Sequence, residues 1–113
     1  MPFFDITATP GQSLLPGITI RTVWGERIML SFLDFAREGA TVPLHQHVHE
    51  QMGMGLEGEF ELVIGDEVRL IGPGDVYLIP SGVEHSATAV EGPARALDIF
   101  SPPRDEYKTK RVK

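Results

Sequence analysis

Short apolar and β-branched runs, separated by glycine and proline, fill most of the chain from residue 18 onward. No window keeps a helical period over three turns, whereas Phe60, Leu62 and Ile64 alternate with neighbours that include two glutamates. We expect strands over residues 18–23, 28–35, 44–47, 51–56, 59–64, 67–71, 75–79, 85–90 and 94–100. Many short strands, with Gly65-Asp66 as a hairpin turn, predict an all-β fold, either an antiparallel sandwich or a closed barrel.

Two segments depart from this regular alternation. The run 28–35 is apolar on both faces except at Ser31 and Asp34, so we expect it to lie between layers or against a second copy of the chain. The turn-rich stretch before residue 18 predicts an N-terminal arm over residues 1–17 rather than a core element. The barrel is then expected over residues 18–101. A tail over residues 102–113 should end in a solvated basic segment.

Composition narrows the class of protein and of partner. The length of 113 residues suits one domain. A domain of this size buries only a modest core, and forming an oligomer would bury more apolar surface. The net charge of −6 argues against nucleic acid as a partner, because binding phosphates needs a basic surface. The absence of cysteine excludes disulfide and thiolate chemistry. The N-terminal sequence has neither a basic leader nor a long apolar run, so we expect no membrane span and a cytoplasmic location.

The four histidines of the chain gather in two short, glycine-framed segments. His45, His47 and His49 lie in the first segment, and His85 lies in the second. Neutral imidazole is the commonest protein ligand of transition metals, so this clustering predicts one metal site built from two distant pieces of chain. On an extended strand His45 and His47 point to one face, and His49 would be a competing ligand.

Two charged residues near the C-terminus are candidates for chemistry. Asp98 interrupts the apolar run 96–100, where a buried carboxylate without a partner would be costly. It is either a general acid or base in the barrel mouth, or an outward-facing or arginine-paired structural residue. Arg104 follows two prolines and either folds back to clamp a carboxylate or stays solvated.

The first histidine segment matches one of the two motifs of the cupin superfamily. That motif reads Gly, five residues, His-x-His, three or four residues, Glu, six residues, Gly. Gly39, His45, His47 and Gly58 fit this spacing, with Gln51 in the position of the glutamate.

The second segment matches the partner motif, which reads Gly, five residues, Pro-x-Gly, two residues, His, three residues, Asn. Gly74, Pro80, Gly82 and His85 fit, and Ala89 replaces the asparagine. The chain therefore resembles a single-domain cupin β-barrel, a double-stranded β-helix or jelly roll with its metal inside the mouth.

The cupin resemblance implies a ligand set of His45, His47, Gln51 and His85 around one divalent transition metal ion. Ni, Zn, Fe, Mn, Co and Cu all accept such ligands. The family pattern places a turn at residues 48–50, which points His49 away, and otherwise His49 replaces Gln51.

Glutamine in the glutamate position changes the expected chemistry. Three neutral imidazoles and a neutral amide leave the charge of a divalent ion unneutralised, which favours an anionic oxygen ligand and Lewis-acid catalysis. Gly53 and Gly55 share the face of Gln51, so they either leave room beside the metal or mark a bulge or twist. Met52, Met54 and Leu56 take the opposite face, which we expect to belong to the core.

The segment from Asp98 through Phe100 to Arg104 narrows the resemblance to small cupins of pectin and alginate degradation that linearise unsaturated uronates, the KdgF type. That resemblance implies a catalytic Asp98, with Phe100 and Arg104 binding a small anionic sugar, and a homodimer. The expected reaction is the opening of 4,5-unsaturated uronate monosaccharides. The alternatives are an Fe(II) cupin dioxygenase acting on another small molecule and a non-catalytic sugar- or ligand-binding barrel.

Overall fold

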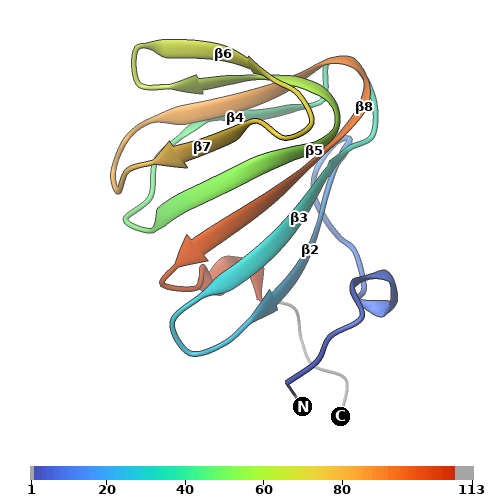
Figure 1. The fold of residues 1–113 in the computed structure, drawn as a ribbon, viewed down its shortest axis with the longest axis vertical. Coiled ribbons are helices and arrows are strands. Elements are labelled where there is room, and N and C mark those ends of the chain that lie inside the picture. The colour runs from blue at the N-terminus through green and yellow to red at the C-terminus, as the bar shows by residue number, and fades with distance from the viewer. Residues whose placement is uncertain (1, 109–113) are drawn as a thin grey trace.

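A computed structural model describes residues 2–108 and is built almost entirely of strands (Figure 1). Within this range the elements are η1 (Ile6–Ala8), β1 (Gln12–Leu15), β2 (Ile18–Trp24), β3 (Met29–Phe35), β4 (Thr41–His45), β5 (Glu50–Ile64), β6 (Glu67–Ile71), β7 (Val76–Ile79), β8 (His85–Ser101) and η2 (Asp105–Tyr107). The all-β prediction is confirmed.

The strands of the described range form one antiparallel sheet that folds over on itself. The hydrogen-bonded order is β1-β2-β3-β8-β5-β6, with β4 added to β8 and β7 added to β5. One layer holds β1, β2, β3 and β7 with the adjoining halves of β8 and β5. The other layer holds β4 and β6 with the remaining halves, as Figure 1 shows around the long β5 and β8.

Four of the expected strands merge into these two long ones. We predicted breaks at residues 57–58 and 91–93, but β5 and β8 run through both and pair with each other over most of their length. The pairing register shifts between Gly55 and Phe60, so the glycine and proline residues there bend the strands instead of ending them. Gly58 has a φ of +65°, and a Cβ on it would strike the carbonyl oxygen of Pro93. This bend lets each strand serve both layers.

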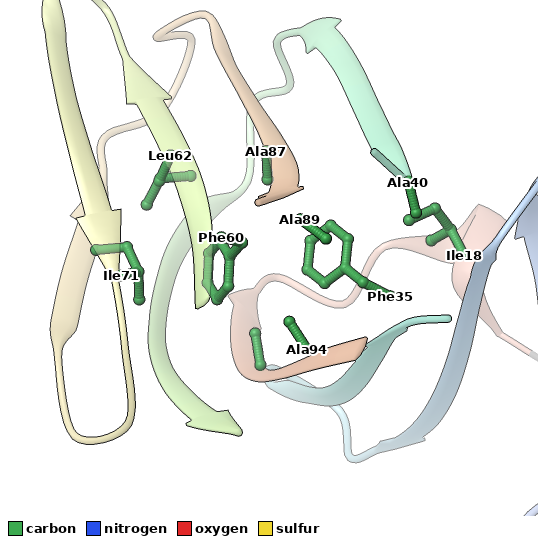
Figure 2. Packing of buried hydrophobic residues seen from close by; sticks show 10 residues of the cluster. Ile18, Phe35, Ala40, Phe60, Leu62, Ile71, Ala87, Ala89 and Ala94 are labelled. Atoms are coloured by element: carbon green, nitrogen blue, oxygen red, sulfur yellow. The ribbon is translucent and has the colours of Figure 1, made fainter. Parts of the chain in front are cut away.

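The apolar core fills the end of the barrel at this bend. Phe35 and Phe60 stack with ring centroids 5.2 Å apart, and both are 1% exposed. Alanines from β8 and from the residue before β4, with larger side chains from β2, β5 and β6, surround the two rings (Figure 2): Ile18, Ala40, Leu62, Ile71, Ala87, Ala89, Ala94 and Ala96. Bulky rings against alanines satisfy close packing between two curved layers.

The N-terminal segment is less detached than the sequence predicted. Gln12–Leu15 forms β1 on the edge of β2, and Leu14 and Leu15 pack against the core, so the prediction of no core element before residue 18 is wrong there. At the other terminus, η2 packs onto the barrel through the buried Tyr107. The basic end over residues 109–113 lies outside the described residues.

The opposite face of β5 also differs from the prediction. Met52 is 46% exposed, and Met54 and Leu56 are only partly buried, so these three residues lie on the outer surface and not in the core. Among residues 2–108, no helix has the length and apolar character to cross a membrane.

Candidate metal centre and its cavity

Three histidines from the two sequence motifs meet inside one end of the barrel. His45 ends β4, His85 begins β8, and the strand register pairs them directly, with ring centroids 4.2 Å apart. The ring of His47 lies 4.8 Å from that of His85. One ligand atom from each of the three lies within 4.8 Å of the others, so the group can hold a metal ion.

Backbone carbonyls set the tautomer of each ring. The Nδ1 atoms of His45, His47 and His85 lie 2.8, 3.0 and 2.9 Å from the carbonyl oxygens of residues 43, 49 and 83. A carbonyl only accepts hydrogen bonds, so each Nδ1 carries the proton and each Nε2 keeps its lone pair. The buried Nε2 of His85 has no hydrogen-bond partner among the described residues. This arrangement fits a metal, because a carbonyl that holds one ring nitrogen orients the other nitrogen toward the ion.

The position of His47 corrects one prediction. We expected His45 and His47 on one strand, but β4 ends at His45 and His47 lies in the following loop. The second motif holds that loop: Gly82 donates its N–H to the carbonyl of His47 at 2.8 Å, and Ser81 donates its hydroxyl to the carbonyl of Val48 at 2.6 Å. The two motifs therefore stabilise each other through backbone contacts as well as sharing a candidate metal.

Gln51 links the histidines to a buried carboxylate. Its Oε1 lies 3.2 Å from the Nε2 of His47, and its amide hydrogen-bonds to Asp98. Because Nδ1 of His47 holds the proton, its Nε2 and the Oε1 of Gln51 both present lone pairs to each other. Two ligand atoms of one cation are arranged in this way. The donor set of three imidazoles and one amide oxygen suits a divalent transition metal.

His49 sits beside this group without joining it. Its ring lies 5.4 Å from that of His47, and the set that can share one ion contains His45, His47 and His85. Its carbonyl oxygen instead accepts the hydrogen bond from Nδ1 of His47. The structure therefore places His49 as a backbone support for a neighbouring ring.

Burial determines the charge of two of the three histidines, His47 and His85. Burial lowers the pKa of His85 to about 4 and also lowers the pKa of His47. Both rings are therefore neutral near pH 7, which is the form that binds a metal.

Asp98 points into the barrel and is 5% exposed. Burial raises the pKa of its carboxyl to about 6, although hydrogen bonds from Tyr77 and Gln51 oppose this. The Tyr77 hydroxyl donates to Oδ1 of Asp98 at 2.7 Å. The outward-facing alternative is thus wrong, and the structural partner found is a tyrosine. A carboxyl that titrates near neutral pH is suited to proton transfer.

Gly53, which pairs with Asp98, and Gly55, which pairs with Ala96, serve different purposes. A Cβ on Gly53 would overlap both the Tyr77 ring and the Asp98 carboxylate, so its absence makes room for that pair. A Cβ on Gly55 would strike the carbonyl oxygen of Gly72, and the pairing register of β5 shifts just after Gly55. The space at Gly53 is therefore occupied by the Tyr77–Asp98 pair and is not room beside the metal, whereas the bulge alternative holds at Gly55.

Arg104 folds back over the mouth. Its side chain is 11% exposed, and its guanidinium carbon lies 3.9 Å from the ring centroid of Tyr107 and 5.3 Å from that of Phe100. The Nε of Arg104 pairs with Glu106 at 2.7 Å. Thr22 donates its hydroxyl to the carbonyl of Tyr107, which anchors η2 on β2. The solvated alternative for Arg104 is therefore wrong.

A single cavity receives most of these side chains. Its lining includes His45, Gln51, Tyr77, His85, Asp98, Phe100, Arg104 and Tyr107. The sequence did not point to Tyr77 or Tyr107 as site residues. Tyr77 could have been found from its position in the expected strand 75–79, where alternation allows it to point inward. Tyr107 lies beyond the last expected strand, so no alternation pattern indicated it.

Comparison with known proteins agrees with this architecture. Residues 32–100 match the cupin domain family. The pectin degradation protein KdgF of Dickeya dadantii (strain 3937) is 28% identical over 106 residues, which cover 93% of this chain and 96% of that protein. The structure of KdgF from Halomonas sp. is 34% identical, with a TM-score of 0.88 over 96% of this chain and 99% of that one.

A second solved structure supports the fold alone. The RmlC-like cupin from Shewanella frigidimarina NCIMB 400 has a TM-score of 0.89 at 24% identity, covering 96% of each chain. Together with the paired histidine motifs and the jelly-roll topology, these similarities show that the chain belongs to the cupin family and is a KdgF-like member of it.

Proposed function

We propose that the protein opens the ring of 4,5-unsaturated uronate monosaccharides, as part of pectin or alginate breakdown, in a metal-dependent and non-redox reaction. The observation that carries this proposal is the shared cavity, in which Asp98 and Arg104 lie beside the histidine group. The similarity to proteins named KdgF, one of them a pectin degradation protein, supports the same substrate class.

The metal-binding residues would be His45, His47, Gln51 and His85. A divalent ion bound there would supply Lewis-acid stabilisation of negative charge on a substrate oxygen. The four ligands are neutral, so the residues themselves leave that charge available to an anionic substrate.

Asp98 would move the proton that the reaction requires. Its carboxylate accepts the proton of the anomeric hydroxyl as the bond from the anomeric carbon to the ring oxygen breaks. The ring oxygen becomes an enolate oxygen, and the proton is delivered to the enol carbon to give a linear keto-aldehyde. No atom or electron is gained or lost overall, and a carboxyl pKa of about 6 suits both accepting and returning the proton.

Arg104 and Phe100 would hold the substrate against these groups. The stacking of the Arg104 guanidinium on two rings restricts its orientation, as pairing with a substrate carboxylate requires. Phe100 is 2% exposed and lines the cavity, where its ring can pack on a sugar face.

A spectroscopic assay tests this function directly. Metal-loaded protein is mixed with an unsaturated uronate, and the loss of the enoic ultraviolet absorbance is followed. We expect acceleration over buffer in the wild type and its loss in Asp98→Asn with metal content retained. A wild-type rate equal to that of buffer would overturn the proposal and leave the binding-barrel alternative. Substrate-dependent oxygen consumption would instead indicate the dioxygenase alternative.

We also propose that the protein is a homodimer joined through the outer face of the larger layer. Strand register places two apolar rows side by side across this face: Leu78, Met52, Ile99, Leu30 and Val23, then Val76, Met54, Leu97 and Phe32, with Arg21 of β2 at the edge of the second row. Met52 and Leu78 are 46% and 47% exposed. A second copy related by a twofold axis presents the same rows, so apolar surface would meet apolar surface.

Sedimentation of charged variants tests the dimer. Met52→Lys should convert a dimer to a monomer, because it places a charge in the centre of the face. Val68→Lys, at a position 57% exposed on β6 and outside these rows, is the matched control and should leave the mass unchanged. A wild-type monomer at tens-of-micromolar concentration would refute this interface.

A further inference from the structure

One buried hydrogen bond near the candidate site spans three strands. Tyr77 on β7 and Asp98 on β8 both pair with Gly53 on β5, so the three residues form one cross-strand row that faces the interior. Two strands separated by a third lie roughly 9–10 Å apart. The Tyr77 hydroxyl nevertheless reaches Oδ1 of Asp98 at 2.7 Å, passing over the position that a side chain at residue 53 would occupy.

The missing side chain at residue 53 permits this contact. A Cβ built there would overlap the Tyr77 ring and the Asp98 carboxylate at once. Any residue other than glycine carries that Cβ and would close the gap. Gly53 has no positive φ, so backbone conformation does not call for glycine here, and space is the remaining reason.

Two donors from different strands together restrict the carboxylate. Tyr77 donates to one oxygen from β7, and the amide of Gln51 also hydrogen-bonds to Asp98 from β5. Phe60 packs edge-on against the Tyr77 ring with centroids 6.3 Å apart, which limits movement of the phenol. The carboxylate is therefore fixed about its side-chain torsion, as a proton-transferring group requires.

We propose that Tyr77, seated in the notch left by Gly53, is a positioning residue that holds the Asp98 carboxylate in the orientation needed for proton transfer. This inference rests on the proposed function, since it assigns Asp98 the proton. Tyr77 acts through its hydrogen bond to Asp98. A phenylalanine at residue 77 would fill the same volume and lack only the donor, so the hydroxyl can be tested separately from packing.

Steady-state kinetics of Tyr77→Phe is the decisive measurement. Loss of a partner that orients a functional group costs about 10–100-fold in activity, and we expect this loss in kcat with KM and metal content near the wild-type values. Gly53→Ala separates the same two groups by a different means and should give a kcat loss of similar size. Gly25→Ala is the control, because a Cβ there meets nothing within 4 Å and the residue lies outside the cavity.

A second readout requires no turnover. Urea unfolding of metal-free wild type, Tyr77→Phe, Asp98→Ala and the double variant forms a double-mutant cycle. If the hydroxyl acts on Asp98, the loss of stability caused by Tyr77→Phe should be smaller once Asp98 is alanine.

Two results would overturn the inference while leaving the proposed function intact: a Tyr77→Phe enzyme with wild-type kcat, or additive losses of stability in the cycle. A wild type without activity would instead refute the proposed function, and the unfolding cycle would still report whether the two side chains are coupled.

Discussion

The two ends of the barrel interior are built from the same two strands, but one end is apolar and the other is polar. At the bend, β5 and β8 contribute Phe60 and a series of alanines to a dry cluster. At the mouth the same inward faces carry Gln51, Asp98 and His85, all buried and all polar. One end is an apolar packed core, and the other holds the polar side chains of the candidate site.

This difference shows how a small fold separates stability from function. The inward period of two runs along β8 from His85 to Ala89 and resumes from Ala94 to Phe100, shifted by one residue across the bend at 90–93. The polar groups of the mouth have specific partners: backbone carbonyls for Nδ1 of the three imidazoles, and Tyr77 and Gln51 for the carboxylate. A buried polar group without such partners would destabilise the fold. At the mouth the carboxylate and the Nδ1 atoms are paired, whereas the Nε2 of His85 has no partner among the described residues and lies where the three histidines could share one ion.

The largest effect expected is at the mouth. His85→Ala should weaken metal binding by more than the roughly 10–100-fold typical of losing a residue that only supports a ligand, because it removes a direct ligand. Elemental analysis and calorimetric titration measure this loss. His49→Ala is the control, since its ring lies outside the three-histidine group, and it should keep the metal. Equal losses in both variants would contradict the assigned ligand set.

The corresponding change at the packed end should affect stability instead. Phe35→Ala removes one member of the aromatic stack and should lower the free energy of unfolding by about 3–5 kcal/mol. Urea unfolding followed by fluorescence or circular dichroism measures it. Metal affinity of the folded variant should stay near the wild-type value, and a large drop would show that the two ends are coupled.

Acid titration of metal-free protein should separate the polar groups of the mouth. The pKa of His85 is lowered from 6.5 to about 4, so its contribution to stability is present above pH 6.5 and is lost as the pH falls toward 4. The pKa of Asp98 is raised from 3.8 to about 6, so its contribution is present below pH 3.8 and is lost as the pH rises through 6. The two dependences oppose each other over this window.

Asp98→Asn removes one of these opposing dependences. Between pH 7 and pH 4 the variant should lose about 2–3 kcal/mol of stability relative to the wild type, given about 1.4 kcal/mol per unit of pKa shift. Denaturant unfolding of both proteins at several pH values gives this difference. Parallel stability curves would mean that the Asp98 carboxyl keeps an ordinary pKa in the folded protein.

The smallest effect expected comes from Gln51→Glu. The change adds a carboxylate beside Asp98 and removes the amide donor that binds it, so the two acids should repel. Metal should bind at least as tightly, because a charged oxygen replaces a neutral one, while activity falls by about 10–100-fold. Titration and the ultraviolet assay together distinguish these outcomes. Unchanged activity would show that the amide has no part in orienting Asp98.

The sequence predicted the repeating parts of the molecule well. Period-two alternation located nearly every strand, and the spacing of His45, His47 and His85 was enough to indicate a shared site. The prediction failed at strand ends, because alternation does not show whether two neighbouring strands are one continuous strand. The glycine and proline residues near 57–58 and 91–93 predicted strand ends, but they bend β5 and β8, because a bulge needs the same residue types as a turn.

Other errors came from contacts that periodicity cannot express. Met52 and Met54 are apolar and alternate correctly, yet they face outward, because alternation identifies two faces without saying which one the barrel closes upon. Tyr107 follows the last strand, where no pattern predicts that the chain folds back over the mouth, and the folded-back position of Arg104 was favoured only through the family resemblance.

By itself the sequence determined the all-β class, the two histidine motifs and the choice of glutamine over glutamate, because each depends on residue type and local spacing. Only the tertiary structure decided the tautomers of the rings, the inward direction of Asp98 and its bond to Tyr77. The tautomers depend on how the backbone carbonyl two residues from each histidine is oriented, which residue spacing does not give. The contact between Asp98 and Tyr77 depends on strand register, and the space at Gly53 acquires meaning only when both of its neighbours across the sheet are known.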